Sequence, residues 1–273
     1  MEIAFPLSSG ACLKLTPAAE NQPGYPTSQL QKGLVLTFNG QDLAEEGVGF
    51  GVPVLKFGVK TIFPAAVELF NCTEGQEVSA IYRMNLEERL SAPRLRNRSL
   101  YQIKNHLADI YRRYPTTRRA LTALSNALRD GFGWQTTYEY AGWDYSLSMH
   151  YAVESQAGIV SVSIDTTELP KEGLTEVMVM NEQGAHYFDT YSDSNGMHLH
   201  GEAIGSWEEV TAAHASFVSR SHGLAFSLPR LAGARLFRGR ELIIERLAWA
   251  GFGYSILPTS QRFVYSLKIE RLP

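Results

Sequence analysis

Two histidines and three carboxylates lie within fourteen residues of this sequence, in the stretch DTYSDSNGMHLHGE at 189–202. Histidine and carboxylate side chains transfer protons and bind metals, so such a cluster could form a catalytic or metal site. An antiparallel sheet also commonly keeps one polar, solvated face, which is the simpler explanation of the same residues. The pattern therefore defines a candidate site and leaves both explanations open.

The Asn-Gly pair at 195–196 predicts a two-residue hairpin turn of type I′, because that turn needs positive φ at both central positions. Counting outward from this turn places Asp189 opposite Glu202. Side chains alternate across a strand, so the opposite face would be mostly apolar and would point toward the core. The ionisable face of the predicted hairpin would carry Asp189, Tyr191, Asp193, His198, His200 and Glu202.

Four residues of this face, Asp189, His198, His200 and Glu202, are candidate catalytic residues. Two carboxylates directly opposite one another repel and need a proton, a cation or an arginine to relieve them. His198 and His200 would present two imidazoles on one side of a strand, and Glu202 could complete a facial triad for a divalent transition metal. The HxH-then-Glu order loosely resembles the pattern of cupins. It departs from that pattern because Glu202 follows after a single residue and no downstream histidine is placed as a fourth ligand.

A second stretch, 132–154, combines aromatic rings with ionisable groups. Tryptophan and tyrosine rings have flat apolar faces that suit the C–H patches of a sugar ring. His150 and Glu154 could transfer protons beside such a ring and are further candidate catalytic residues. The alternative is that the aromatic residues fill the core and edges of a β protein. The candidate ligand-binding residues of this stretch are Trp134, Tyr138, Glu139, Trp143 and Asp144.

Three arginines, Arg235, Arg238 and Arg240, lie close together in the last part of the chain. Guanidinium groups recognise carboxylates and phosphates, so an anionic sugar would favour such a cluster. Arg238 is therefore added to the candidate ligand-binding residues. Ion pairs with local carboxylates on neighbouring strands are the alternative.

Composition limits the partners that can be expected. The net charge is −3 and the pI is about 6.2, so the concentrated basic surface that nucleic acid requires is not indicated. No window reaches the roughly eighteen uninterrupted apolar residues of a membrane-spanning helix. Cys12 and Cys72 are the two cysteines, which fits a reducing compartment, although a bridge between them stays open. The first residues do not resemble a signal peptide, so we expect a cytoplasmic protein.

Most of the chain has the pattern of β structure. From 134 onward, β-prone segments alternate with turn residues, which predicts antiparallel hairpins. Only 99–130 has helical spacing, as two consecutive helices. We expect a mainly β protein, a large antiparallel β-sandwich (a supersandwich-like arrangement is one form of it) with a two-helix insertion near 99–130. The predicted turns include Ala141-Gly142, Glu182-Gln-Gly184, Asn195-Gly196 and Arg238-Gly239.

The whole chain, 1–273, would form a single β-rich domain. The alternative is an N-terminal β segment (1–98) followed by the helical insertion and the β-sandwich (99–273).

These features predict a carbohydrate-active or carbohydrate-binding protein, as an enzyme of the epimerase, hydrolase or lyase type that uses histidines and carboxylates on a sheet face. A β-sandwich that binds a ligand or a protein without catalysis is the alternative, and a cupin-like metal-dependent enzyme is a minor one. We expect a small polar ligand such as a sugar, no nucleic-acid or membrane partner, and no cofactor, with a divalent metal as the alternative. An enzyme should gather carboxylates and histidines at one place, with a perturbed pKa.

Overall fold

The computed structural model describes residues 2–17, 33–44, 49–91, 135–244, 247–256 and 262–272. These residues are almost entirely antiparallel β-strands, as the alternation and the turn residues predict. The two helices expected near 99–130 lie outside the described residues. Within the described part, no helix is long and apolar enough to cross a membrane. Cys12 and Cys72 are both free thiols.

A short 3-10 helix, η3 (Gly201–Ile204), lies between the twelfth and thirteenth strands. The strands, in chain order, are β1 (Ile3–Pro6), β2 (Ala11–Leu15), β3 (Val35–Phe38), β4 (Gln41–Asp42), β5 (Phe50–Phe57), β6 (Lys60–Thr73), β7 (Glu77–Ser91), β8 (Gln135–Glu154), β9 (Ile159–Asp165), β10 (Glu176–Gly184), β11 (Thr190–Asp193), β12 (His198–His200), β13 (Glu208–Glu209), β14 (His214–Ser219), β15 (Leu224–Pro229), β16 (Ala234–Ile244), β17 (Leu247–Ile256) and β18 (Arg262–Arg271).

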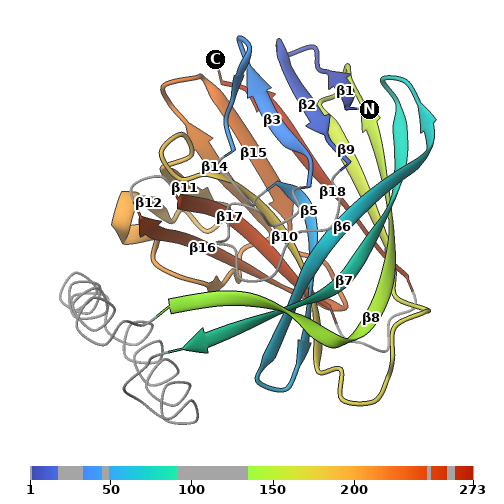
Figure 1. Cartoon of the computed structure of the whole chain (residues 1–273). Helices are drawn as coiled ribbons and strands as arrows, with labels where there is room; N and C mark the ends of the chain where they lie inside the picture. Colours follow the sequence, from blue (N-terminus) through green and yellow to red (C-terminus); the bar gives the residue numbers. More distant parts are fainter. Residues whose placement is uncertain are drawn as a thin grey trace.

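Two sheets contain these strands (Figure 1). Strands β1 to β4 form a small sheet in chain order. The other strands form one sheet of fourteen in the order β12-β11-β14-β15-β18-β9-β8-β7-β6-β5-β10-β17-β16-β13. Its two end strands, β12 and β13, follow one another in the chain and are joined through η3. The large sheet therefore folds back on itself, and its two ends approach one another.

The inner faces of the large sheet pack together as a sandwich rich in aromatic rings. The ring of Phe252 on β17 lies 4.9 Å from that of Phe217 on β14 and 5.9 Å from that of Phe226 on β15, measured between centroids. Both contacts are edge-on, the geometry that aromatic quadrupoles favour. Every second residue of β7 from Val78 to Met84 is buried in this core, as expected of a strand with one face toward the core.

The small N-terminal sheet packs against the same core, and the sequence pattern did not predict its first two strands. Phe5, Leu13 and Leu36 are fully buried in the same hydrophobic cluster as the large sheet. The buried Gln183 of β10 links the two sheets. Its side-chain oxygen accepts a hydrogen bond from the Leu36 N–H (3.1 Å), and its amide donates to the Leu34 carbonyl (3.2 Å).

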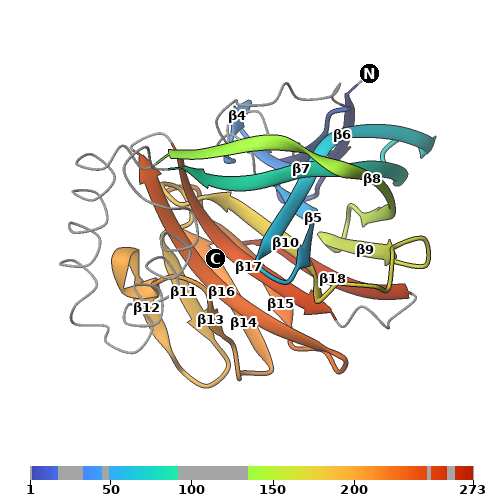
Figure 2. The ribbon, with the colours of Figure 1, turned by 60° about the horizontal axis from the view of Figure 1, so that its bottom comes forward.

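Strands β6, β7 and β8 are long and change direction at aligned bulges. The register of β6 with β7 shifts on both sides of Pro64. Between β7 and β8, Met84 pairs with Tyr145 and Leu86 with Tyr140, so one residue of β7 lies opposite four of β8. Bulges bend strands, and beyond this bend the end of β7 and the start of β8 lie beside β16 and β17 (Figures 1 and 2). Residues 86–91 and 135–140 are called the arm below.

Two of the predicted turns are wrong, because Gly142 and Gly239 lie inside strands, and the turn predicted at 182–184 lies further along the chain at 185–187. Gly142 falls in the bulge of β8, Gly184 ends β10, and Gly239 lies in the middle of β16. Gly239 pairs with Gly251 of β17 and lies against the ring of Trp207. Glycine in a strand often marks the close approach of another group, and here close packing rather than a chain reversal requires it.

Candidate functional site

The stretch 189–202 forms the hairpin of β11 and β12 at one end of the large sheet, but its register differs by one residue from the predicted one. Thr190 pairs with His200, and Ser192 pairs with His198. A shift of one residue moves side chains to the opposite face. Tyr191 is therefore buried at 1% exposure, whereas His198 and His200 are exposed. The prediction of one shared ionisable face is wrong.

The chemistry of the turn explains this register. Gly196 has a φ of +84°, but among the described non-glycine residues positive φ occurs at Asn39 and Asn71 and not at Asn195, so the turn is not type I′. Asp193 Oδ1 accepts hydrogen bonds from the N–H groups of Asn195 (2.9 Å) and Met197 (3.2 Å). The loop consequently contains three residues and ends in a left-handed glycine, with Asp193 holding it as an Asx turn.

The predicted metal ligands do not converge. His200 Nδ1 lies 3.1 Å from Thr190 Oγ1, and His200 Nε2 lies 3.7 Å from Asp189 Oδ2, with the imidazole 71% exposed. His198 is exposed on β12, and Glu202 is exposed in η3. Across the part of the chain that the structure describes, no group of three or more His, Cys, Asp or Glu side chains is arranged to hold a metal ion. The structure thus shows a polar hairpin at 189–202.

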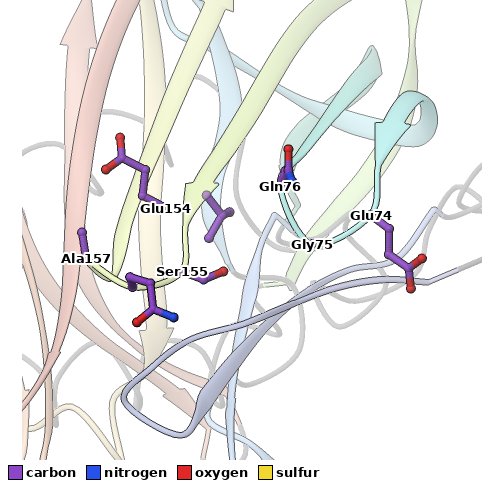
Figure 3. A pocket seen from close by; sticks show the side chains of 8 residues that line it. Glu74, Gly75, Gln76, Glu154, Ser155 and Ala157 are labelled. Atoms are coloured by element: carbon purple, nitrogen blue, oxygen red, sulfur yellow. The ribbon is translucent and has the colours of Figure 1, made fainter.

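His150 and Glu154 lie on the exposed side of β8 and also do not form an acid–base pair. His150 Nδ1 lies 3.2 Å from Ser79 Oγ, and its Nε2 lies 3.5 Å from Glu77 Oε2. Glu154 lines an open depression of about 500 Å³ between two hairpin turns. The carboxylates of Glu154 and Glu74 point away from one another at its two sides (Figure 3).

The carboxylates predicted to bind a ligand in the second stretch are paired with arginines of β7. Glu139 Oε2 lies 2.9 Å from Arg89 Nη1. Asp144 Oδ2 accepts a hydrogen bond from Arg83 Nε at 2.7 Å. All four side chains are about half exposed, so these are cross-strand surface pairs of the kind that contribute little to stability.

The aromatic residues of the second stretch occupy different places. Trp143 packs at the rim of the core, with its ring centroid 5.4 Å from that of Phe57 and 6.2 Å from that of Tyr145. Tyr138 lies in the arm and is buried at 5% exposure. Trp134 lies outside the described residues. Among the described residues, Trp143 and Tyr138 therefore pack in two separate clusters and do not form one binding surface.

Arg238 is buried between the two ends of the large sheet. Its Nη2 donates to Glu208 Oε2 at 2.7 Å, and its Nη1 donates to the Ile204 carbonyl. The guanidinium carbon lies 4.8 Å from the ring centroid of Tyr191. The side chain is only 6% exposed, so it joins β16, β13 and β11, and the alternative of a local carboxylate partner is confirmed.

A different pair of carboxyl groups lies on the outer face of β10, β17 and β16. Glu182 of β10 pairs with Gly251 of β17, which pairs with Gly239 of β16, and Glu241 follows two residues later on β16. Paired residues, and residues two apart on a strand, share one face. Adjacent strands lie about 4.8 Å apart, so the Cα atoms of the two glutamates are roughly 12 Å apart and their side chains can reach toward each other.

Gly251 and Gly239 leave the strip of this face beside Glu182 without side chains, while Trp249 of β17 lies on the same face and pairs with Glu241. A Cβ atom at Gly251 would lie 2.1 Å from the Asn181 carbonyl oxygen, and one at Gly239 would lie 2.8 Å from Cδ2 of Trp207. The indole ring of Trp207 therefore lies directly on the sheet, and its Nε1–H donates to Glu241 Oε1 at 2.7 Å. Trp207 and Glu241 are both partly exposed, whereas Glu182 is buried at 8% exposure. Glu182, Glu241, Trp207, Gly239 and Gly251 are called the carboxyl face below.

Burial changes the protonation of one carboxyl group of this face. Desolvation, with the negative charge of Glu241 as a second cause, raises the pKa of Glu182 from 4.5 to about 8. Tyr138 of the arm lies within reach of the same charge. Its pKa is raised far above 10 by burial first and then by the charges of Glu88 and Glu241. At neutral pH, Glu182 consequently keeps its proton beside a neighbouring carboxylate.

Sequence reasoning missed Glu182, Trp207 and Glu241. Glu182 falls in a segment predicted to be a turn because of Gly184. Gly239 was assigned to another turn because glycine is common in turns. The glycines at 239, 251 and 253, within β-prone segments, are the signal that could have identified this face. That signal does not say which strands are neighbours, which depends on pairing between distant parts of the chain.

Comparisons with known proteins do not identify a family. No protein-family model matches the chain, and no curated protein matches it. Two structures of an alpha-N-acetylgalactosaminidase from Bifidobacterium bifidum, a GalNAc complex and a ligand-free form, are similar over 98% of this chain at 12% identity, with TM-scores of 0.49 and 0.48. This chain spans 36% of theirs. A galactose mutarotase-like protein from Lactobacillus casei ATCC 334 is similar over 99% of both chains at 10% identity, with a TM-score of 0.39. Similarities of this degree do not indicate what the chain binds or does.

Proposed function

We propose that this protein is an enzyme that transfers protons to and from a small, polar, ring-shaped substrate, such as a sugar, at the carboxyl face. The observation that supports this proposal is the placement of Glu182 and Glu241 on one face, with the pKa of Glu182 raised beside the charge of Glu241. Two titratable groups whose environments separate their pKa values are the usual arrangement of a general acid and a general base.

Glu241 would act as the base and Glu182 as the acid. In an epimerase-like reaction on a cyclic sugar, Glu241 removes the proton of the anomeric hydroxyl while Glu182 protonates the ring oxygen, and the ring C–O bond breaks. Return of the two protons after rotation of the new carbonyl group closes the ring as the other anomer. One acid and one base suffice, and no covalent intermediate forms.

The neighbouring side chains suit a substrate with apolar C–H patches. Trp207 presents a partly exposed indole ring beside Glu241. Met178 and Met180 of β10 lie near Gly253 on the same face and are also partly exposed. Aromatic and thioether surfaces of this kind accept the C–H side of a sugar ring while polar groups contact its hydroxyls.

Hydrolysis or elimination at a glycosidic bond is a second candidate, because a pair of carboxyl groups roughly 5–10 Å apart can also perform that chemistry. Binding without catalysis is the third, since exposed rings and thioethers alone can hold a ligand. Freshly dissolved galactose and glucose, followed by NMR of their anomeric protons, test the first function. Aryl glycosides and unsaturated-product absorbance test the second, and calorimetry with the same sugars tests the third.

The decisive variants are Glu182→Gln and Glu241→Gln, which keep the shape of each side chain and remove its proton chemistry. We expect each to lower kcat/KM about 100-fold or more, because general acids and bases contribute about this much. Glu68→Gln is the matched control, since Glu68 is exposed on β6 away from this face. Full activity in both variants would overturn the proposal, and sugar binding with no turnover in the wild type would assign a binding function instead.

A further inference from the structure

Trp207 makes a contact with Glu241 that the proposed acid–base roles do not by themselves require. Its Nε1–H donates to Glu241 Oε1 at 2.7 Å, whereas desolvation acts on Glu182. A hydrogen bond donated to a carboxylate favours its ionised form. We infer that Trp207 is a positioning residue that fixes the Glu241 carboxylate and keeps it the ionised member of the pair. This inference rests on the proposed function.

Close packing on one side fixes the indole ring of Trp207. A Cβ atom at Gly239 would lie 2.8 Å from its Cδ2 and 3.0 Å from its Cε3, and one at Gly253 would lie 3.6 Å from its Cζ3. The ring therefore lies across β16 and β17 at Gly239 and Gly253, which have no side chains. This leaves the indole little freedom to turn its N–H away from Glu241.

The backbone on both sides of Trp207 is also held to β16. The Arg240 N–H donates to the Gly205 carbonyl at 2.8 Å. After Trp207, Glu208 pairs with Arg238 in the β13–β16 ladder and accepts a hydrogen bond from its guanidinium at 2.7 Å. The indole is consequently fixed through both its ring and its chain, as a group that orients a catalytic carboxylate should be.

Two titratable groups of the described residues, Glu182 and Tyr138, lie within reach of the charge of Glu241. The charge of Glu241 raises the pKa of Glu182 from β10 and of Tyr138 from β8, and Glu88 of the arm adds a second negative charge near Tyr138. Since Trp207 is a neutral donor, it lowers the cost of charge on Glu241 without neutralising that charge. Removing the donor should make Glu241 easier to protonate.

NMR of the indole N–H groups tests this contact without any assay of activity. The chain has four tryptophans, so the Trp207 resonance is the one lost in Trp207→Phe, and the other three report whether each variant is folded. We expect the Trp207 resonance to titrate with pH in the wild type. In Glu241→Gln it should move and stop titrating. An unchanged resonance with the same titration in Glu241→Gln would overturn the inference, whatever the activities are.

Kinetics then separates positioning from a merely structural role. Trp207→Phe should shift the acidic limb of the kcat/KM profile to higher pH, with about a tenfold loss below that limb if the hydrogen bond contributes one pKa unit. In the Glu241→Gln background the same substitution should have no further effect on kcat. Equal losses at every pH, or additive losses in the double variant, would show that Trp207 acts only by packing. Failure of the two Gln variants to reduce activity would instead contradict the proposed function.

Discussion

Two glutamates on the same face of β10 show how surroundings decide the charge of a side chain. Burial alone would raise the pKa of Glu176, but hydrogen bonds from Lys56 and Ser255 and the charge of Arg235 outweigh it, and the pKa is lowered. Six residues further on, Glu182 has the opposite shift, because it is buried near Glu241 rather than near a cation. Identical residues on one strand thus differ in their protonation at neutral pH.

The raised pKa of Glu182 makes stability depend on pH in a defined direction. The folded protein keeps a proton on Glu182 up to about pH 8, whereas the unfolded chain releases it near 4.5. The free energy of unfolding should therefore fall as pH rises between these values, by about 1.4 kcal/mol for each pKa unit at most. Glu182→Gln should remove this dependence and be more stable than wild type at pH 9.

Urea unfolding of wild type and Glu182→Gln at pH 5 and pH 9 measures this effect. Glu68→Gln is again the control, because its exposed side chain loses little solvation on folding. Parallel stability curves for wild type and Glu182→Gln across this range would show that Glu182 is not buried as a neutral acid.

At the level of the strand, the glycines of β17 are needed because other atoms pack closely against them, whereas many glycines of loops are needed for a positive φ. Gly251→Ala would place a methyl group 2.1 Å from the Asn181 carbonyl oxygen and 2.7 Å from the Glu182 Cα, both backbone atoms of β10. The two strands would have to separate, and we expect a loss of about 1–3 kcal/mol or more in the free energy of unfolding.

Gly142→Ala is the matched control, because no atom lies within 4 Å of the added methyl group. We expect it to change stability by no more than about 0.5 kcal/mol. Thermal and urea unfolding of both variants give the comparison. A Gly251→Ala protein as stable as Gly142→Ala would mean that the β10–β17 contact is looser than described.

The strands themselves could be predicted from the sequence, and the site could not. The period of two located most of the β segments from 134 onward, because alternation follows directly from which side chains face the core. The register of the β11–β12 hairpin could not be predicted, since Asp193 holds a three-residue loop where Asn-Gly alone suggests two. That single residue changes the face on which His198 and His200 lie.

The carboxyl face was unpredictable for a different reason. Glu182 and Glu241 come from β10 and β16, and only the pairing of both strands with β17 brings them to one face. Neither residue has a neighbour in the sequence that reveals its charge state. Burial, and the approach of Tyr138 from the bent arm, are properties of the folded chain that a local pattern does not contain.

For the whole molecule, Arg238 joins the two ends of the large sheet. It contacts β13 through Glu208, η3 through the Ile204 carbonyl and β11 through the Tyr191 ring. Arg238→Met should cost about 2–3 kcal/mol, because it removes the buried guanidinium that donates to Glu208 and to the Ile204 carbonyl. Arg235→Met, on an arginine whose side chain is 60% exposed, should cost less than about 1 kcal/mol.

Hydrogen exchange gives the spatial test of this prediction. Arg238→Met should increase exchange first in β11 and β13, which the arginine contacts, and in β12, which pairs with β11. If exchange rose evenly across the sheet, or if both arginine variants were equally stable, Arg238 would not be the residue that holds the ends together.

The short end strands of the large sheet affect how this protein behaves at high concentration. β12 has three residues and β13 has two, so each end strand itself presents few backbone N–H and C=O groups at the border of a sheet of fourteen strands. Long, flat strand edges are templates on which other chains add and from which fibrils grow. End strands as brief as these offer little length of their own for this addition. We expect them to limit association of the protein through its sheet borders.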